Sequence, residues 1–133
     1  MEKYVEKLNY YEELLKDIEN QTEELCLEAV RFNGWLLKLI EKQTEQICIE
    51  AVKQDGLALE FIKEQTEEMC ILALEQDGHI LRFVKEQTLK LCCVAVQQHI
   101  GALSYVEDRF IDQVCEELNI SQVYVPKDNT IEE

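Results

Sequence analysis

The chain has 133 residues, of which 47% are hydrophobic and 31% charged, a composition typical of one folded domain rather than of a disordered segment. The 28 acidic and 13 basic side chains give a net charge of −15, which argues against direct binding to nucleic acid or to an anionic membrane surface. The first twenty residues lack the apolar run of a secretory signal and no segment has the length of a membrane span, so we expect a cytoplasmic protein.

Residues 1–20 are predicted to form a capping segment. They align as a degenerate copy of the repeat that follows, in which Leu15 and Ile18 match Leu37 and Ile40 but the glycine and the threonine are missing. Such divergence is expected at the end of a stack of repeats, because one face of the terminal unit meets water.

Four repeat units of equal length follow without a gap, with a period of 22. They occupy residues 21–42, 43–64, 65–86 and 87–108. Each unit opens with Gln-Thr and carries a cysteine at its sixth position, an alanine at its ninth and a leucine at its seventeenth. Because so short a unit cannot enclose an apolar stripe alone, neighbouring units must stack. We therefore predict an all-α fold, an α-solenoid of about four helix-turn-helix repeats between divergent N- and C-terminal capping helices.

Each unit is predicted to contain two short helices. Thr44 and its equivalents are expected to cap the first helix by accepting a hydrogen bond from a free backbone amide. Gly56 and its equivalents are expected to end that helix in the left-handed conformation. A second helix of about two turns follows, as in residues 57–64. In the fourth unit His99-Ile100-Gly101 stands where Asp-Gly is expected, so its turn can differ.

The C-terminal part contains a predicted capping helix at 109–118, which lacks the Gln-Thr start. Residues 1–118 are therefore expected to form a single helical-repeat domain, and residues 119–133 a C-terminal tail that contains the only proline, Pro126.

The segment "EAVKQDGLALEFIKEQT", residues 50–66, resembles the short repeats of a family that is catalogued as a domain of unknown function in giant DNA viruses and some bacteria. The family pattern has the form A-V-K-x-N/D-G-x-A-L-x-x-hydrophobic. The resemblance covers roughly residues 21–108 and is most specific at Ala51, Asp55, Gly56 and Leu59. The family has no known activity, so the resemblance implies the fold and leaves the function open.

The six cysteines do not indicate a disulfide framework or a zinc site. Equivalent positions of stacked helices lie about 8–10 Å apart, beyond the roughly 7 Å that a disulfide allows between Cα atoms, and there is no C-x-x-C pair. We expect Cys26, Cys48, Cys70 and Cys92 to be buried, and Cys93 and Cys115 to be the most accessible.

The two histidines, His79 and His99, occupy different positions of the repeat and belong to no catalytic motif. We expect them to be surface or turn residues. The sequence predicts no enzyme activity, no cofactor and no metal site.

Candidate binding residues lie where the repeats differ, because packing positions must stay alike while outward positions are free to specialise. The twelfth and fifteenth positions flank the turn between the two helices. The candidates there are Phe32, Trp35, Gln54, Leu57, Gln76 and His79. Phe32 and Trp35 have the composition of an interface hot spot if exposed, although Tyr10, Tyr11 and the N-terminal cap can also cover them.

We therefore expect a non-catalytic module that binds another protein, plausibly an accessory protein of a virus or bacterium, in the host cytoplasm if viral. One alternative is a nucleic-acid mimic that inhibits a basic nuclease or another nucleic-acid-processing defence enzyme. Its acidic face would consist of Glu23, Glu24, Glu45, Glu67 and Glu68. DNA carries about six charges per 10 Å of axis, whereas each repeat has a net charge of only −1 to −3. A second alternative is a self-assembling structural protein, for example a homodimer.

Overall fold

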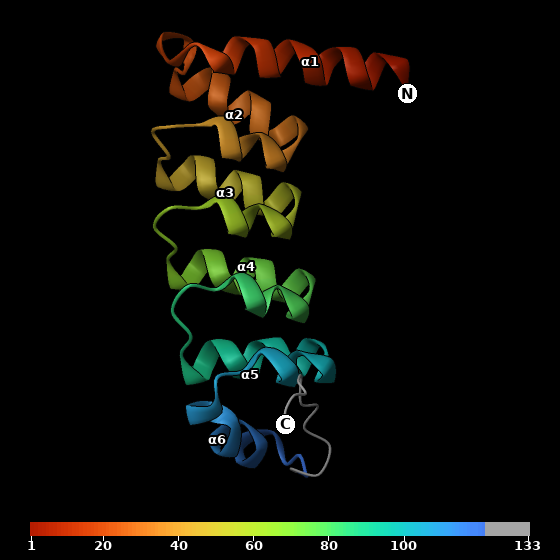
Figure 1. Cartoon of the computed structure of the whole chain (residues 1–133), viewed down its shortest axis with the longest axis vertical. Helices are drawn as coiled ribbons and strands as arrows, with labels where there is room; N and C mark the ends of the chain where they lie inside the picture. The colour runs from red at the N-terminus through yellow and green to blue at the C-terminus, as the bar shows by residue number, and fades with distance from the viewer. Residues whose placement is uncertain (122–133) are drawn as a thin grey trace, which may run out of the picture.

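The structure, a computed structural model, describes residues 1–121, and these form an all-α solenoid. The α-helices are α1 (Glu2–Lys16), α2 (Glu23–Phe32), α3 (Glu45–Gln54), α4 (Glu67–Gln76), α5 (Leu89–Gln98) and α6 (Asp108–Leu118). The 3₁₀ helices are η1 (Ile18–Asn20), η2 (Gly34–Leu39), η3 (Gly56–Phe61), η4 (Gly78–Phe83) and η5 (Ile100–Tyr105). Figure 1 shows them stacked in chain order along one axis.

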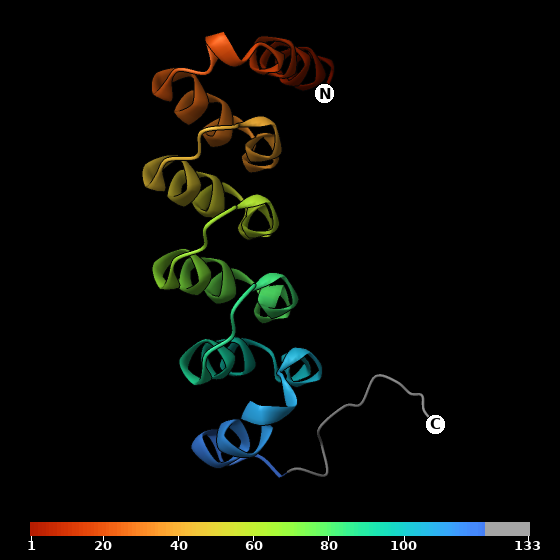
Figure 2. The same cartoon turned by 60° about the vertical axis from the view of Figure 1, so that its left-hand side comes forward.

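The repeats form two columns. In Figure 2 the α-helices from α2 to α6 lie above one another in one column and the 3₁₀ helices of the repeats lie in a second column beside it. Consecutive α-helices from α2 to α6 contact each other, and so do consecutive 3₁₀ helices from η2 to η5. The predicted solenoid of stacked helix pairs is therefore confirmed.

The threonine caps are confirmed in all four repeats. Thr22, Thr44, Thr66 and Thr88 each accept a hydrogen bond from the backbone amide three residues later, with N–O distances between 3.1 and 3.3 Å. The glutamates that follow in the first three repeats lie in the first turn of each helix, where the helix dipole favours negative charge.

The predicted second helix of each repeat is present, and it is a 3₁₀ helix. In the second repeat it ends at Phe61, before the predicted end at residue 64. The amide of Ile62 donates to the carbonyl of Leu59 over 3.1 Å, which is 3₁₀ spacing. Asp55 starts this helix by accepting the amide of Leu57 over 3.0 Å. Its short length allows the tighter coil, which is uncommon in longer segments.

The predicted role of the turn glycines was wrong. Among residues 1–121 no glycine has a positive φ angle, and the residue that ends the first helix is extended, with φ near −156° at Asp55. Glycine is needed because the next repeat approaches closely. A Cβ atom on Gly34 would lie 2.5 Å from the carbonyl oxygen of Ala51, and one on Gly78 would overlap that of Ala95. In the fourth repeat Ile100 occupies this position and is 56% exposed, so the close approach does not recur there.

The first residue of each repeat forms a ladder of internal hydrogen bonds, which we call the glutamine ladder. It consists of Gln21, Gln43, Gln65 and Gln87. The Nε2 of Gln65 donates to the carbonyls of Leu59 (3.1 Å) and Phe83 (2.9 Å), and its Oε1 accepts the amide of Lys85 (2.9 Å). Gln65 thus joins the 3₁₀ helices of two successive repeats. Gln43 likewise reaches back to the carbonyl of Leu37, and Gln21 to that of Leu15 in α1.

A single apolar core runs from Tyr11 to Cys115. The four repeat cysteines are buried as predicted, but Cys115 is buried as well, at 3% exposure, whereas Cys93 is half-buried. Cys115 was expected to be accessible. It is covered because α6 packs its apolar face on α5.

The two ends of the stack differ from the internal repeats. Leu15 is buried like its counterpart Leu37, but Ile18 is 58% exposed, because it lies in the short η1 helix rather than on the core side. At the other end α6 begins at Asp108, one residue before the predicted start. Of the predicted tail 119–133, the part from 122 onward lies outside the described residues. In residues 1–121 no helix is long and apolar enough to cross a membrane.

Candidate functional site

The stack has two long edges, which we name by their contents. The capping edge is where α2 to α5 begin, at residues 21–24, 43–46, 65–68 and 87–90. The turn edge is where these helices end and the 3₁₀ helices start, at residues 32–35, 54–57, 76–79 and 98–101. In Figure 1 the capping edge lies on the left and the turn edge on the right. Ten-residue helices separate the edges by about 15 Å, so the two predicted binding surfaces lie apart.

Phe32 and Trp35 lie on the turn edge in different environments. Phe32 is half-buried beneath the N-terminal helix, with ring centroids 4.8 Å from Tyr4 and 5.5 Å from Tyr11. Trp35 remains 41% exposed. Its indole nitrogen donates to Oδ2 of Asp55 over 2.9 Å, and its ring stands edge-on to Phe61 at 5.6 Å. The cap therefore covers Phe32, whereas Trp35 presents a fixed aromatic surface.

Gln54 and Gln76 connect neighbouring repeats across the turn edge. The Oε1 of Gln54 accepts the amide of Gly34 over 2.6 Å, and that of Gln76 accepts the amide of Gly56 over 2.7 Å. Nε2 of Gln76 also donates to the carbonyl of Val52 over 2.6 Å. Both residues are exposed, but these polar atoms are used within the stack.

Leu57 and His79 follow Trp35 along the same edge. Leu57 is half-buried, and the side chain of His79 is 45% exposed. Together with Trp35 they form the row of fifteenth-position side chains that the sequence predicted, one from each of the first three repeats. Gly101 ends the row in the fourth repeat without a side chain.

The acidic candidates lie on the capping edge, and all five are exposed. They are Glu23, Glu24, Glu45, Glu67 and Glu68. Basic groups stand among them. Nζ of Lys90 lies 3.6 Å from Oε1 of Glu67, and Nζ of Lys63 donates to the carbonyl of Glu41 over 2.7 Å. A groove on this edge is lined by Lys63, Lys85 and Arg109 as well as by Glu67. The negative charge of the capping edge is thus partly offset where repeats three and four meet.

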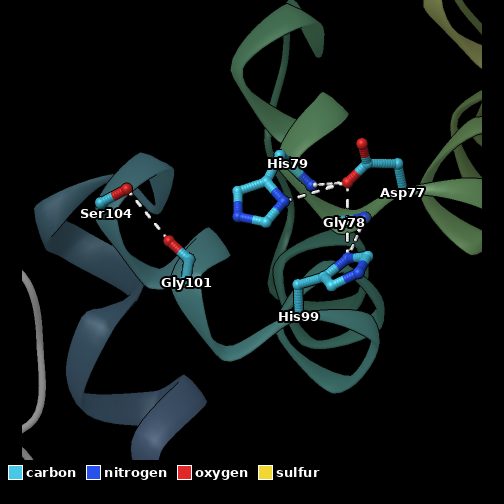
Figure 3. Close-up of polar contacts among 6 residues, drawn as sticks. All are labelled: Asp77, Gly78, His79, His99, Gly101 and Ser104. Carbon is cyan, nitrogen blue, oxygen red and sulfur yellow. Dashed lines mark hydrogen bonds and ion pairs between the residues drawn. The ribbon is translucent and has the colours of Figure 1, made fainter.

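The structure also brings the two histidines together with a carboxylate, which the sequence analysis missed. Nδ1 of His79 lies 3.0 Å from Oδ1 of Asp77, and Nδ1 of His99 lies 3.4 Å from the same oxygen (Figure 3). The two imidazole centroids are 4.9 Å apart. We call Asp77, His79 and His99 the histidine cluster. The signal in the sequence was the spacing of the two histidines, which is close to one repeat length and places them at adjacent turns of the stack.

Backbone amides donate hydrogen bonds to the carboxylate and to one imidazole of this cluster. The backbone amide of His79 donates to Oδ1 of Asp77 over 2.9 Å, and this bond, together with the hydrogen bond to the His79 ring and the electrostatic attraction of both imidazoles, lowers the pKa of Asp77. The carboxylate is therefore ionised at neutral pH. The amide of Gly78 donates to Nδ1 of His99 over 3.1 Å, so the neutral ring carries its proton on Nε2.

The buried thiols show no sign of chemical activation. Burial raises the pKa of Cys48 and Cys70 to about 11 and that of Cys92 to about 12. Because the thiolate is the reactive form, these side chains are core residues rather than nucleophiles.

One protein family matches the sequence. The model described as "Domain of unknown function (DUF4116)" matches residues 22–66 and again residues 47–90, which together span just over half of the chain. The chain belongs to the DUF4116 family. No curated protein and no solved structure matches it.

Each DUF4116 match has the length of about two repeat units, so the family unit corresponds to a pair of stacked helix-turn-helix units. Trp35, Leu57 and His79 lie within the matched residues. His99 lies beyond residue 90, so the histidine cluster is completed by a residue outside the DUF4116 matches.

Proposed function

We propose that this DUF4116 protein is a non-catalytic module that binds another protein through its turn edge. The contact would be centred on Trp35 and continue along Leu57 and His79.

The exposure of Trp35 carries this proposal. A side chain that is 41% exposed is held in place by the bond to Asp55 and by contact with Phe61. A rigid aromatic surface loses little conformational entropy on binding, and tryptophan is among the residues most enriched at interface hot spots. The Oε1 atoms of the neighbouring Gln54 and Gln76 already accept hydrogen bonds within the stack. We therefore expect these glutamines to border the contact and to contribute little of the binding energy.

Mimicry of nucleic acid is the second candidate, favoured by the net charge of −15 and by the exposed glutamates of the capping edge. The lysines and the arginine along that edge weaken it, because they interrupt the row of negative charge that a basic groove would recognise. Self-assembly is the third candidate, supported by the exposed apolar residues Tyr4, Val5 and Tyr10 of the terminal helix α1.

The experiment is affinity capture from cell extract with the full chain and two matched variants. The turn-edge variant carries Trp35→Ala and Leu57→Ser, and the capping-edge variant carries Glu23→Gln and Glu24→Gln. We avoid Phe32→Ala, because Phe32 packs under the cap and its loss would destabilise the fold. Washing at about 0.1 M and about 1 M salt separates apolar from electrostatic binding.

We expect a partner that survives high salt and the capping-edge changes but is lost with the turn-edge variant. With that partner purified, the dissociation constant should rise about 30-fold, which corresponds to a hot spot of about 2 kcal/mol. If a partner were still captured by the turn-edge variant but were released at high salt, the acidic surface would instead be the site. A molar mass that rises with protein concentration in light scattering would favour self-assembly.

We also propose an accessory role for the protein, in which binding modulates or inhibits its target, in the cytoplasm of a bacterium or of an infected host. This role rests on the resemblance of the repeat sequence to repeats of giant DNA viruses and some bacteria.

A further inference from the structure

The turn edge holds three side chains whose donor atoms converge on one point between the third and fourth repeats. Asp77 and His79 belong to the third repeat and His99 to the fourth (Figure 3). We propose that Asp77, His79 and His99 form a binding site for a divalent transition-metal ion.

The spacing of the donor atoms fits a shared ion. Metal–ligand bonds of about 2.1 Å at angles of about 90–109° separate two ligand atoms by about 3.0–3.4 Å. Oδ1 of Asp77 lies 3.0 Å from Nδ1 of His79 and 3.4 Å from Nδ1 of His99. One donor atom from each of the three residues lies within 4.8 Å of the others. An ion can therefore reach all three with little movement of the backbone.

The donor set determines the class of metal. Two imidazole nitrogens and one carboxylate oxygen suit zinc and other divalent transition metals better than calcium or magnesium, which prefer oxygen ligands. The three side chains are each 45–48% exposed, so water would complete the coordination. Binding through Nδ1 requires His79 to carry its proton on Nε2, which a neutral ring can do by exchange with solvent.

Comparison of the three repeat junctions explains why the cluster occurs once among the described residues. The three residues of the cluster occupy the thirteenth and fifteenth positions of one repeat and the thirteenth position of the next, so the equivalent positions can be compared at each junction. The first junction brings together Asn33, Trp35 and Asp55, the second Asp55, Leu57 and Asp77, and the third Asp77, His79 and His99. The bond between Trp35 and Asp55 demonstrates this contact at the first junction. Only the third junction has metal-binding side chains at all three positions.

His99 lacks the capping role that its position has elsewhere. Asn33, Asp55 and Asp77 each cap the following 3₁₀ helix with a side-chain oxygen, whereas η5 has no side-chain cap at His99. Loss of such a cap typically weakens a helix terminus. Gly101 leaves space beside His79, since a Cβ atom there would lie 3.0 Å from its Nε2. At this junction the helix cap is missing at His99 and a side chain is missing at Gly101, and both positions lie next to the two imidazole rings.

Two existing contacts compete with the metal. An ion shared by Nδ1 of His79 and Oδ1 of Asp77 would replace the 3.0 Å hydrogen bond between these atoms. The amide of Gly78 donates to Nδ1 of His99 over 3.1 Å, and an ion at that nitrogen would displace this bond. The ion would replace it with a link between repeats three and four, so metal binding should stabilise the stack. This site goes beyond the proposed protein binding, although His79 takes part in both.

The test uses the full chain, zinc chloride as the probe, and Cys93→Ser as the background, because Cys93 is the half-buried thiol. The chain contains two histidines, so imidazole proton signals in NMR report on both proposed nitrogen ligands without ambiguity. We expect both rings to shift together and to saturate at one zinc per chain. The melting temperature should rise with zinc, since a ligand of the native state stabilises it.

Two variants take residues that other repeats carry at the same positions. His79→Leu introduces the leucine of the second repeat, and His99→Asn introduces the asparagine of the first, which can still accept the Gly78 amide. Each should weaken zinc binding at least about tenfold, as removal even of an outer partner typically does, and abolish the zinc-dependent rise in melting temperature. Asp55→Asn, at the second junction, serves as the control and should bind zinc as the parent does.

Zinc that shifts neither ring, or that binds both histidine variants as tightly as the parent, would overturn the proposal. The readouts need no protein partner. Failure of the metal site is therefore distinguishable from failure of the turn-edge binding surface.

Discussion

The capping edge and the turn edge both join each repeat to the next through hydrogen bonds from side chains to backbone, but they use different residues to do so. On the capping edge the same glutamine recurs in all four repeats. On the turn edge Gln54 and Gln76 accept the glycine amide of the preceding repeat, and at the third junction His99 takes over.

The capping-edge glutamines are the same in every repeat because they are less exposed than the turn-edge side chains and make more hydrogen bonds. Gln65 is half-buried and makes three bonds to backbone groups of two successive repeats, and Gln87 is only 7% exposed, so a replacement would remove several bonds at once from a partly buried position. The turn-edge glutamines Gln54 and Gln76 are exposed, so a shorter side chain there would open their bonding partners to water. One edge is therefore constrained by the fold, whereas the other can acquire new residues.

The largest effect is expected from the glutamine ladder. Gln65→Ala removes three hydrogen bonds to backbone groups and should lower the free energy of unfolding by about 3 kcal/mol, at roughly 1 kcal/mol for each of these bonds. Urea unfolding followed by circular dichroism measures the loss. Gln76→Ala, on the turn edge, removes two bonds, but the loss of this exposed side chain lets water reach the groups that it had covered, so the change should cost less than half as much. Equal losses would contradict the contrast between the edges.

The second-largest effect is expected on the turn edge, where the backbone at Gly78 lies close to the backbone of the next repeat at Ala95. Gly78→Ala places a Cβ atom against the carbonyl oxygen of Ala95 and should cost about 2 kcal/mol, as overpacking of a core does. Gly101→Ala is the matched control, because its Cβ atom meets only the end of the His79 side chain, and its cost should stay below about 1 kcal/mol. Urea unfolding of both variants measures the difference. A similar loss in both would indicate that backbone freedom, not space, requires glycine at Gly78.

A smaller effect is expected at the helix caps of the capping edge. Thr66→Ala removes the oxygen that accepts the amide of Met69 over 3.3 Å and should cost about 1 kcal/mol. Thr66→Ser keeps a hydroxyl at the same place and should retain most of the stability. Thermal unfolding of the two variants side by side measures the difference. If serine destabilised the protein as much as alanine, the hydroxyl cap would not be the source of the stability.

The smallest effect is expected from the pH dependence of the buried thiols next to the glutamine ladder. Burial raises the pKa of Cys70 from its usual value near 9 to about 11. A thiol in the unfolded chain ionises first, so its contribution to stability is complete below pH 9 and is lost as the pH rises toward 11. The free energy of unfolding should therefore fall as the pH rises through this range, because the unfolded chain releases the proton that the folded chain keeps. The midpoint of urea unfolding, measured at several pH values, reports this fall. Cys70→Ala should reduce that fall, and an unchanged fall would assign it to other groups.

The sequence by itself determined the repeat period, the all-α class, the threonine caps and the burial of the repeat cysteines. These features are local or recur in every unit, so spacing along the chain is enough to recognise them. It also indicated the row of Trp35, Leu57 and His79, because positions that differ among stacked repeats tend to face outward.

Only the tertiary structure decided what neighbouring repeats do to each other. The need for glycine at Gly34 and Gly78 comes from the carbonyl oxygens of the next repeat, not from a local φ angle. The cap decides that Phe32 is covered while Trp35 is exposed. The histidine cluster exists because stacking brings Asp77 and His99, from successive repeats, within 3.4 Å, a contact set by the packing of one repeat on the next.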